Sequence, residues 1–286
     1  MADPKNCAIV GSTGFLGGYL ARCLEGYGIR PLPLNRDRLD FTDVGGITAA
    51  LQQSSAESIV YLAAHSDPTA GDVETFYKVN AFYLSNFLQA AKTVGLPGRF
   101  IYASASSVYG TVEEGDLCED APVAPPNHYG ASKMLGETFC RWFSADLEVI
   151  IARPSNCVGA AQNKKYIVPK IVDAFRKRLP ELVLGDTSIA RDFVDVRDAV
   201  DIFAQILRAQ TAPSVVNVSS GRATQIREII RTLKEISGFC PEITQSEQFM
   251  RKGDIYHQSV NNQVARNLGH EPKFSLRDTL GWMLDQ

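Results

Sequence analysis

Strand-length apolar runs alternate with segments of helical period along the first half of this chain. The runs cover residues 7–10, 32–35, 59–63, 100–103 and 149–152. The segments between them carry apolar residues on one helical face, as at Phe15, Leu16, Tyr19 and Leu20. Buried strands that alternate with one-sided helices are typical of a parallel sheet covered on both faces. Because the crossovers are right-handed, we predict a doubly wound, Rossmann-like α/β fold.

The regular alternation loosens after about residue 155. Short strands are expected near residues 182–184 and 215–218, with a helix before them. We therefore predict a dinucleotide-binding domain over residues 1–155 and a smaller C-terminal region over residues 156–286, interleaved with the sheet.

Two prolines lie in the second apolar run, at positions 31 and 33 of the strand segment. Proline has no N–H to give to a neighbouring strand, and residues two apart in a strand face the same side. The segment is therefore either a strand that is well bonded on one side only, or a shorter strand than the apolar run indicates.

The composition favours an enzyme that acts on a small molecule. The chain has 286 residues, 45% of them hydrophobic, and a net charge of −3. It is long enough to bury a full core, and its charge balance argues against a nucleic-acid partner. Six scattered cysteines without metal-ligand spacing predict free thiols and no metal site. We find no signal peptide and no apolar run of membrane-spanning length, so we expect a cytoplasmic enzyme without a membrane partner.

A glycine-rich loop follows the first predicted strand directly and precedes a helical pattern. Gly11 permits a tight turn, Gly14 allows the backbone to approach a pyrophosphate, and Gly17 allows close helix packing. The helix N-terminus adds free N–H donors. A glycine-rich turn that binds nothing is the alternative, but the flanking strand and helix favour a dinucleotide. The expected contacts are Gly11, Thr13, Gly14, Phe15, Leu16 and Gly17.

The end of the second strand indicates which dinucleotide is bound. Arginine suits a 2′-phosphate, whereas an acidic residue suits the ribose hydroxyls. Arg36 favours NADP(H); the alternative is NAD(H), with Asp37 on the ribose and Arg36 and Arg38 as solvated charges. The cofactor contacts expected here are Asn35, Arg36, Asp40 and Phe41, the last two beside the adenine.

A tyrosine and a lysine four residues apart, Tyr129 and Lys133, would share one helix face. A nearby ammonium lowers the pKa of a phenol, so Tyr129 could act as acid or base near neutral pH. Tyr166 and Lys170 have the same spacing. Only the first pair follows a serine-rich strand end, at residues 104–110, and sites in open α/β sheets form at such ends. We therefore interpret Tyr129 as catalytic and Tyr166 as structural.

Together these motifs resemble the extended short-chain dehydrogenase/reductase family, in the branch of nucleotide-sugar epimerases, dehydratases and 4-keto reductases. The resemblance covers nearly the whole chain. It rests on the loop at 11–17, on Leu62, Ala63 and Ala64, on Tyr129 with Lys133, and on residues 107–110, 153–156, 191–196, 217–221 and 251–254.

The resemblance implies a role for each matching residue. Lys133 would hold the nicotinamide ribose and Tyr129 would move the sugar hydroxyl proton. The remaining cofactor contacts would be Leu62, Ala63, Ala64 and Pro154. The substrate contacts of a nucleotide sugar would be Ser106, Ser107, Asn156, Val168, Arg191 and Arg251, with Asn156 and the two arginines on the diphosphate. Surface ion pairs with Asp192 and Asp254 are the alternative for these arginines.

One departure from the family pattern concerns the third catalytic residue, a serine or threonine that falls on Ala105 here. We predict that Ser106 or Ser104 reaches the Tyr129 hydroxyl region instead and is catalytic. Otherwise the enzyme works without this hydroxyl, which would slow catalysis without abolishing it.

The predicted reaction is NAD(P)H-dependent reduction of the 4-keto group of a nucleotide-linked 6-deoxyhexose, with Tyr129 as general acid. A dehydratase is disfavoured because Ser106 and Ser107 stand where that branch has an acidic pair. An NAD-dependent nucleotide-sugar 4-epimerase and a cofactor-binding regulator with little activity are the alternatives. By family analogy we expect a homodimer that pairs through helices near residues 74–94 and 129–145.

Overall fold

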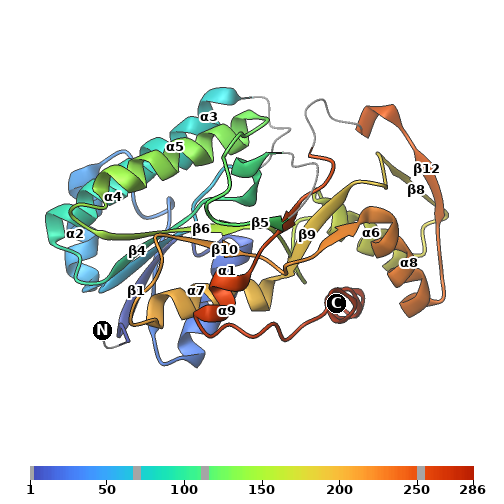
Figure 1. Ribbon diagram of the computed structural model, residues 1–286. Coiled ribbons are helices and arrows are strands. Elements are labelled where there is room, and N and C mark those ends of the chain that lie inside the picture. The colour runs from blue at the N-terminus through green and yellow to red at the C-terminus, as the bar shows by residue number, and fades with distance from the viewer. Residues whose placement is uncertain (1–2, 67–71, 111–115, 250–254) are drawn as a thin grey trace.

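The computed structural model describes residues 3–66, 72–110, 116–249 and 255–286 (Figure 1). Its centre is a six-stranded sheet in the order β10-β6-β4-β3-β1-β2, and every neighbouring pair is parallel. The strands are β1 (Asn6–Val10), β2 (Arg30–Leu34), β3 (Ser58–Tyr61), β4 (Arg99–Ala103), β6 (Glu148–Pro154) and β10 (Val215–Val218). The predicted doubly wound α/β fold is confirmed.

Helices cover both faces of this sheet, as Figure 1 shows. Along β1, Cys7 and Ile9 pack on the face of α1 and α7, whereas Ala8 and Val10 pack on the opposite face with α2 and α4. This alternation follows from the two-residue period of a strand. The helices are α1 (Phe15–Gly26), α2 (Val44–Ser54), α3 (Val73–Tyr77), α4 (Tyr83–Val94), α5 (His128–Phe143) and α7 (Val196–Arg208), with a π-helical turn (Lys78–Phe82) between α3 and α4.

The two prolines lie in β2, at one edge of the large sheet. The N–H of Arg30 donates to the Lys5 carbonyl, and the N–H of Gly11 donates to the Leu34 carbonyl. Even-numbered positions of β2 therefore bond to β1, and Pro31 and Pro33 face the outer edge, where no strand needs their missing donor. Of the two interpretations given above, the strand bonded on one side is the correct one.

The sheet order reverses beside β1. The chain runs from β1 outward to β2 and then returns to form β3 on the other side of β1. At such a switch point the carboxyl ends of two strands diverge and leave a crevice, which is where open α/β sheets bind ligands. The glycine loop after β1 and the segment after β3 both lie here.

The remaining strands form small sheets beside the large one (Figure 1). Three helices and one face of these sheets share a separate apolar core around Ile171, Phe193 and Ile229. The elements are β5 (Asp116–Leu117), β7 (Asn156–Val158), β8 (Glu181–Leu184), β9 (Ala190–Asp195), β11 (Ala223–Gln225), β12 (Glu242–Gln245), β13 (Ser259–Val260), α6 (Ile167–Arg176), α8 (Ile226–Ser237), α9 (Gln263–Asn267) and α10 (Leu276–Leu284). Two elements of the second half of the chain belong to the large sheet instead: β10 pairs with β6, and α7 packs on one face. The second half therefore contributes to the large sheet and to the small sheets.

Candidate active site

The glycine loop has the close backbone approaches that its sequence predicts. Gly11 adopts φ +87°, and a Cβ there would lie 2.9 Å from the backbone nitrogen of Ala63. A Cβ on Gly17 would overlap the Gly11 carbonyl oxygen. Helix α1 begins at Phe15, with Gly14 as its N-cap. A glycine cradle against a helix N-terminus fits the pyrophosphate of a dinucleotide.

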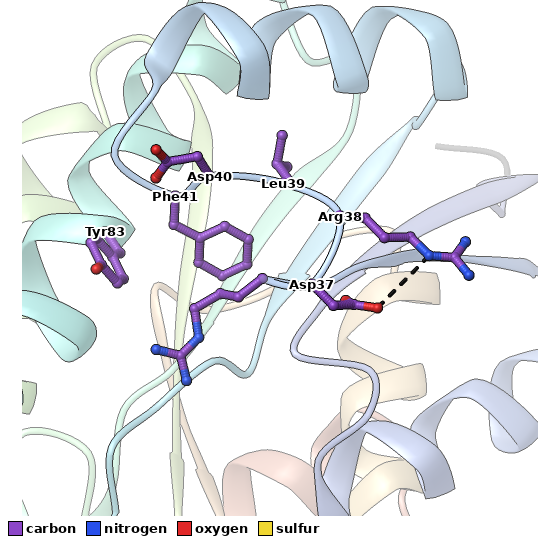
Figure 2. Close-up of a pocket in the computed structure, with 7 residues that line it drawn as sticks. Asp37, Arg38, Leu39, Asp40, Phe41 and Tyr83 are labelled. Atoms are coloured by element: carbon purple, nitrogen blue, oxygen red, sulfur yellow. Dashed lines mark ion pairs between the residues drawn. The ribbon is translucent and has the colours of Figure 1, made fainter.

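The segment after β2 and Tyr83 of α4 line a hollow of about 380 Å³, shown in Figure 2. It brings together Arg36, Asp40 and Phe41, as the sequence predicts. Asp40 accepts hydrogen bonds from the N–H and hydroxyl of Thr42, and these bonds lower the pKa of its carboxyl. Arg36 is exposed, so its guanidinium can reach a ligand in the hollow.

Two other residues predicted here have structural contacts. Phe41 is 2% exposed and packs edge-on against Phe87 at 4.8 Å, so its ring belongs mainly to the core, and only a part of it can lie beside an adenine. Asn35 donates a hydrogen bond of 2.9 Å to the hydroxyl of Ser12. This bond ties the end of β2 to the glycine loop.

Tyr129 and Lys133 lie on α5, whose start is fixed by the Asn127 side chain accepting from the Gly130 N–H. The Nζ of Lys133 donates to the Ala103 carbonyl at 2.7 Å, at the carboxyl end of β4. Lys133 is 2% exposed, and this burial lowers its pKa to about 7. The predicted pair therefore lies at the carboxyl edge of the large sheet.

The acidity of Tyr129 differs from our expectation. Its pKa is raised above the ordinary tyrosine value, first by burial and then by the nearby Tyr166 phenol and Cys157 thiol. We expected the Lys133 ammonium to lower it. The expectation was wrong for this structure because desolvation disfavours the phenolate, while Lys133 donates to a backbone carbonyl and is itself easily deprotonated.

The serines after β4 do not point as predicted. Ser104 donates to the Glu137 carboxylate at 2.7 Å, and Ser106 donates to the Gln258 side-chain oxygen at 2.9 Å. Both hydroxyls are buried and donate to these partners instead of to the Tyr129 region, contrary to our prediction. By contrast, the Ser107 hydroxyl oxygen is buried and has no hydrogen-bond partner among the described residues.

A buried ionic cluster under the site was missed by the sequence analysis. Glu137 is fully buried and accepts two hydrogen bonds from Arg153, at 2.9 and 2.7 Å, besides the one from Ser104 and one from Arg141. Burial acts to raise the pKa of Glu137, but the bonds and charge of Arg153 outweigh it and hold the pKa below the usual range. The available signal was spacing, because Glu137 stands four residues after Lys133.

Two of the predicted substrate residues, Asn156 and Arg191, lie on a small sheet. Asn156 of β7 is exposed and donates to the Asp192 carbonyl, and β7 pairs with β9, which carries Arg191. The Asp192 carboxylate is buried and accepts from Ser155 and from the N–H groups of residues 220–222. Asn156 and Arg191 thus lie on paired strands, with Asn156 opposite Phe193, two residues from Arg191.

Two other substrate predictions stand differently. Val168 is 1% exposed and packs in the apolar core around α6, so its side chain does not face a ligand, contrary to our expectation. Arg251 lies outside the described residues.

The structure also brings Tyr166 to this crevice, although the sequence analysis gave it a structural role. Its hydroxyl lies 2.8 Å from that of Ser66, which follows β3. One residue earlier, the His65 ring lies 4.9 Å from that of Phe76, which in turn lies 6.4 Å from that of Tyr129. Spacing alone could not place Tyr166, because its neighbour Ser66 is 100 residues away.

Comparison with known proteins is consistent with a dinucleotide-binding site. The model of the "NAD dependent epimerase/dehydratase family" matches residues 7–219, and the chain belongs to this family. The predicted resemblance to extended short-chain dehydrogenases/reductases is thereby confirmed. No helix within the described residues has the length and apolar character to cross a membrane.

Two curated relatives are similar to nearly the whole chain. GDP-6-deoxy-D-mannose reductase from Pseudomonas aeruginosa is 30% identical, over 96% of this chain and 90% of its own. GDP-6-deoxy-D-talose 4-dehydrogenase from Aggregatibacter actinomycetemcomitans is 29% identical, over 93% and 92%. Among solved structures, RMD from Pseudomonas aeruginosa complexed with NADPH has a TM-score of 0.89 and 26% identity, with 98% of both chains covered.

Proposed function

We propose that this protein is an NAD(P)H-dependent reductase of the 4-keto group of a nucleotide-linked 6-deoxyhexose. The observation that carries the proposal is the similarity, over more than nine-tenths of the chain, to a GDP-6-deoxy-mannose reductase and a GDP-6-deoxy-talose 4-dehydrogenase. Both names describe oxidoreduction of a GDP-linked 6-deoxyhexose, and the second places it at carbon 4. The presence of Tyr129 and Lys133 at the crevice supports the same reaction.

The bound dinucleotide would supply the hydride to the keto carbon. The glycine loop would hold its pyrophosphate, and Lys133, fixed on the Ala103 carbonyl, would orient its nicotinamide ribose. Tyr129 would donate a proton to the sugar oxygen. Burial raises the pKa of Tyr129, so the phenol carries its proton at neutral pH, as a general acid must before it donates.

NADPH is the cofactor that we favour. Arg36 is exposed and lines the hollow after β2, where its guanidinium could bind a 2′-phosphate. The relative RMD was solved with NADPH. An Arg36→Ala variant should raise the KM for NADPH and leave the KM for NADH near its original value.

The substrate diphosphate would bind between the two parts of the chain. Asn156 and Arg191 come from paired strands of the same small sheet, and Arg251 would join them. Ser107 would contact the sugar, since its buried hydroxyl has no partner among the described residues and can accept or donate a bond to a ligand.

A homodimer and a cytoplasmic location complete the proposal. Phe82 and Trp142 are 53% and 67% exposed, and Phe139 lies between them, 6.4 Å and 5.4 Å from their rings. These rings come from the π-helical turn before α4 and from α5, and such an exposed aromatic cluster fits an interface between two copies. Trp142→Asp should therefore shift the sedimentation of the protein toward monomer. The cytoplasmic location is supported by the six cysteines, which are free thiols.

The deciding experiment incubates the purified protein with NADPH and a GDP-4-keto-6-deoxyhexose. Loss of NADPH absorbance in step with formation of the GDP-6-deoxyhexose is the expected result. Interconversion of sugar epimers without loss of NADPH would instead identify an epimerase. Cofactor binding with no response to any sugar nucleotide would indicate a regulator.

A further inference from the structure

We propose that Tyr166, oriented by Ser66, donates the hydrogen bond to the reacting sugar oxygen that the side chain at position 105 does not provide. The inference rests on the proposed function and names a further catalytic residue for it. It assigns a chemical role to the second tyrosine–lysine segment, which the reaction described above does not use.

Position 105 cannot supply the hydrogen bond itself. Ala105 is 7% exposed, has no donor, and lies at the start of the 3-10 turn Ser106–Tyr109. The hydroxyls of Ser104 and Ser106, on either side of it, donate to Glu137 and Gln258, which are both buried. Turning either hydroxyl toward a substrate would leave a buried acceptor with one bond fewer, at a cost of about 1–3 kcal/mol.

Tyr166 has a defined position near the reacting group. It is the N-cap residue of α6, where its carbonyl accepts from the Lys170 N–H at 3.0 Å. Its hydroxyl lies 2.8 Å from that of Ser66, on the segment that leaves β3. Two observations indicate that this hydroxyl pair lies close to Tyr129. The Tyr166 phenol helps to raise the pKa of Tyr129, and the ring of His65, next to Ser66, contacts the ring of Phe76, which contacts that of Tyr129.

The Ser66–Tyr166 hydroxyl pair has one O–H donor that the bond between them does not use. Two hydroxyls carry two O–H donors, and the bond between them uses one. When Ser66 donates to the Tyr166 oxygen, the Tyr166 O–H is free to donate to a sugar oxygen. Tyr129 would still provide the transferred proton, and Tyr166 would stabilise the charge that develops on the same oxygen without losing its own proton.

The test compares Tyr166→Phe, Ser66→Ala and the double variant Tyr166→Phe/Ala105→Ser with the unchanged protein. Tyr27→Phe is the control, because it also removes a phenol hydroxyl and its bond, here to Asp201, but beyond the far end of α1. All are assayed for kcat and for KM of both substrates, with NADPH binding and thermal melting as checks of folding.

We expect Tyr166→Phe to lower kcat about 10²-fold, the usual cost of losing one donor to a developing oxyanion. The KM for NADPH should hold, Ser66→Ala should show a smaller loss of kcat, and Tyr27→Phe none. Ala105→Ser should restore at least part of the loss in the double variant, because it returns a hydroxyl to the family position. A purely structural Tyr166 would not be rescued in this way.

Several results would overturn the proposal. Unchanged kcat in Tyr166→Phe, or a loss that Ala105→Ser does not repair, would show that Tyr166 is not the donor. If Tyr166→Phe fails to fold, unchanged kcat in Ser66→Ala would have the same meaning. A large kcat loss in Ser107→Ala, repaired by Ala105→Ser, would assign the role to Ser107. An unchanged protein that reduces no keto sugar would overturn the proposed function itself.

Discussion

Two segments of this protein each carry a tyrosine and a lysine four residues apart, but their lysines contact different sheets. Tyr129 and Lys133 start α5, and Tyr166 and Lys170 start α6. Both lysines donate to a strand carbonyl, Lys133 to Ala103 at 2.7 Å and Lys170 to Val183 at 2.9 Å. The first carbonyl ends a strand of the large sheet, whereas the second belongs to a two-stranded sheet.

The continuation of each helix separates the two segments further. Four residues after Lys133 comes Glu137, which holds Arg153 in the buried cluster. Four residues after Lys170 comes Ala174, in an apolar core. The same four-residue spacing therefore occurs in two settings, and only the Tyr129–Lys133 pair lies at the carboxyl edge of the large sheet, where open α/β sheets bind ligands.

The sharpest test of the comparison removes the phenol of the first segment. Tyr129→Phe should lower kcat about 10³- to 10⁴-fold, because a positioned proton donor contributes on this scale. The loss should exceed that of Tyr166→Phe by about tenfold or more. Steady-state reduction of the keto sugar measures both, with NADPH binding as the control. Equal losses in the two variants would contradict the distinction drawn between them.

The buried cluster should matter for stability. Glu137→Gln leaves the Arg153 charge buried without its partner, so we expect the free energy of unfolding to fall by about 3–5 kcal/mol. Glu235→Gln is the matched control, since its ion pair with Arg277 is exposed on both sides and should contribute less than about 1 kcal/mol. Urea titrations measure both changes. A Glu137→Gln effect no larger than the control's would show that the cluster is not a stabilising element.

The lysines should differ in activity. Lys133→Met should lower kcat about 10²-fold, because it would remove the group proposed to orient the nicotinamide ribose. Lys170→Met should leave kcat near that of the unchanged protein, since the Lys170 Nζ contacts a backbone carbonyl and the Phe249 ring. Comparable losses in both variants would remove the functional contrast between α5 and α6.

The smallest expected effect is a pH dependence of stability from Lys133. Burial lowers its pKa from 10.5 to about 7, so between these values the unfolded chain binds a proton that the folded chain has lost. The free energy of unfolding should therefore rise with pH across this window, by at most about 1.4 kcal/mol per pH unit. Urea titrations at pH 7 and pH 9 measure the rise. It should be reduced in Lys133→Met and kept in Lys92→Met, whose amine is exposed.

The fold was predictable where local pattern determines it. Apolar runs and one-sided helices identified five strands of the large sheet, β1, β2, β3, β4 and β6, and the prolines at 31 and 33 left a strand bonded on one side as one of two interpretations. The pattern also placed a strand at residues 215–218, but it could not show that this strand pairs with β6, because the pairing joins segments about 60 residues apart. Strand partners depend on the whole chain, whereas periodicity depends on neighbours.

The positions of site residues were predictable where they follow from backbone geometry or spacing, as for Gly11 in the tight loop and Lys133 on α5. Side-chain direction was not, as Ser106 illustrates. Its hydroxyl bonds to Gln258, 152 residues away, and no local pattern brings these two together. The rise in the Tyr129 pKa has the same origin, because burial is a property of the folded chain.

The prolines of β2 have a consequence for self-association. An exposed strand edge is a template to which another chain can add a strand by backbone hydrogen bonds. Pro31 and Pro33 remove two of the N–H groups that β2 would present along its outer edge. Both outward-facing positions of β2 are prolines, so an added strand would find no N–H donor within it, and the sheet is protected on this side from uncontrolled growth into aggregates.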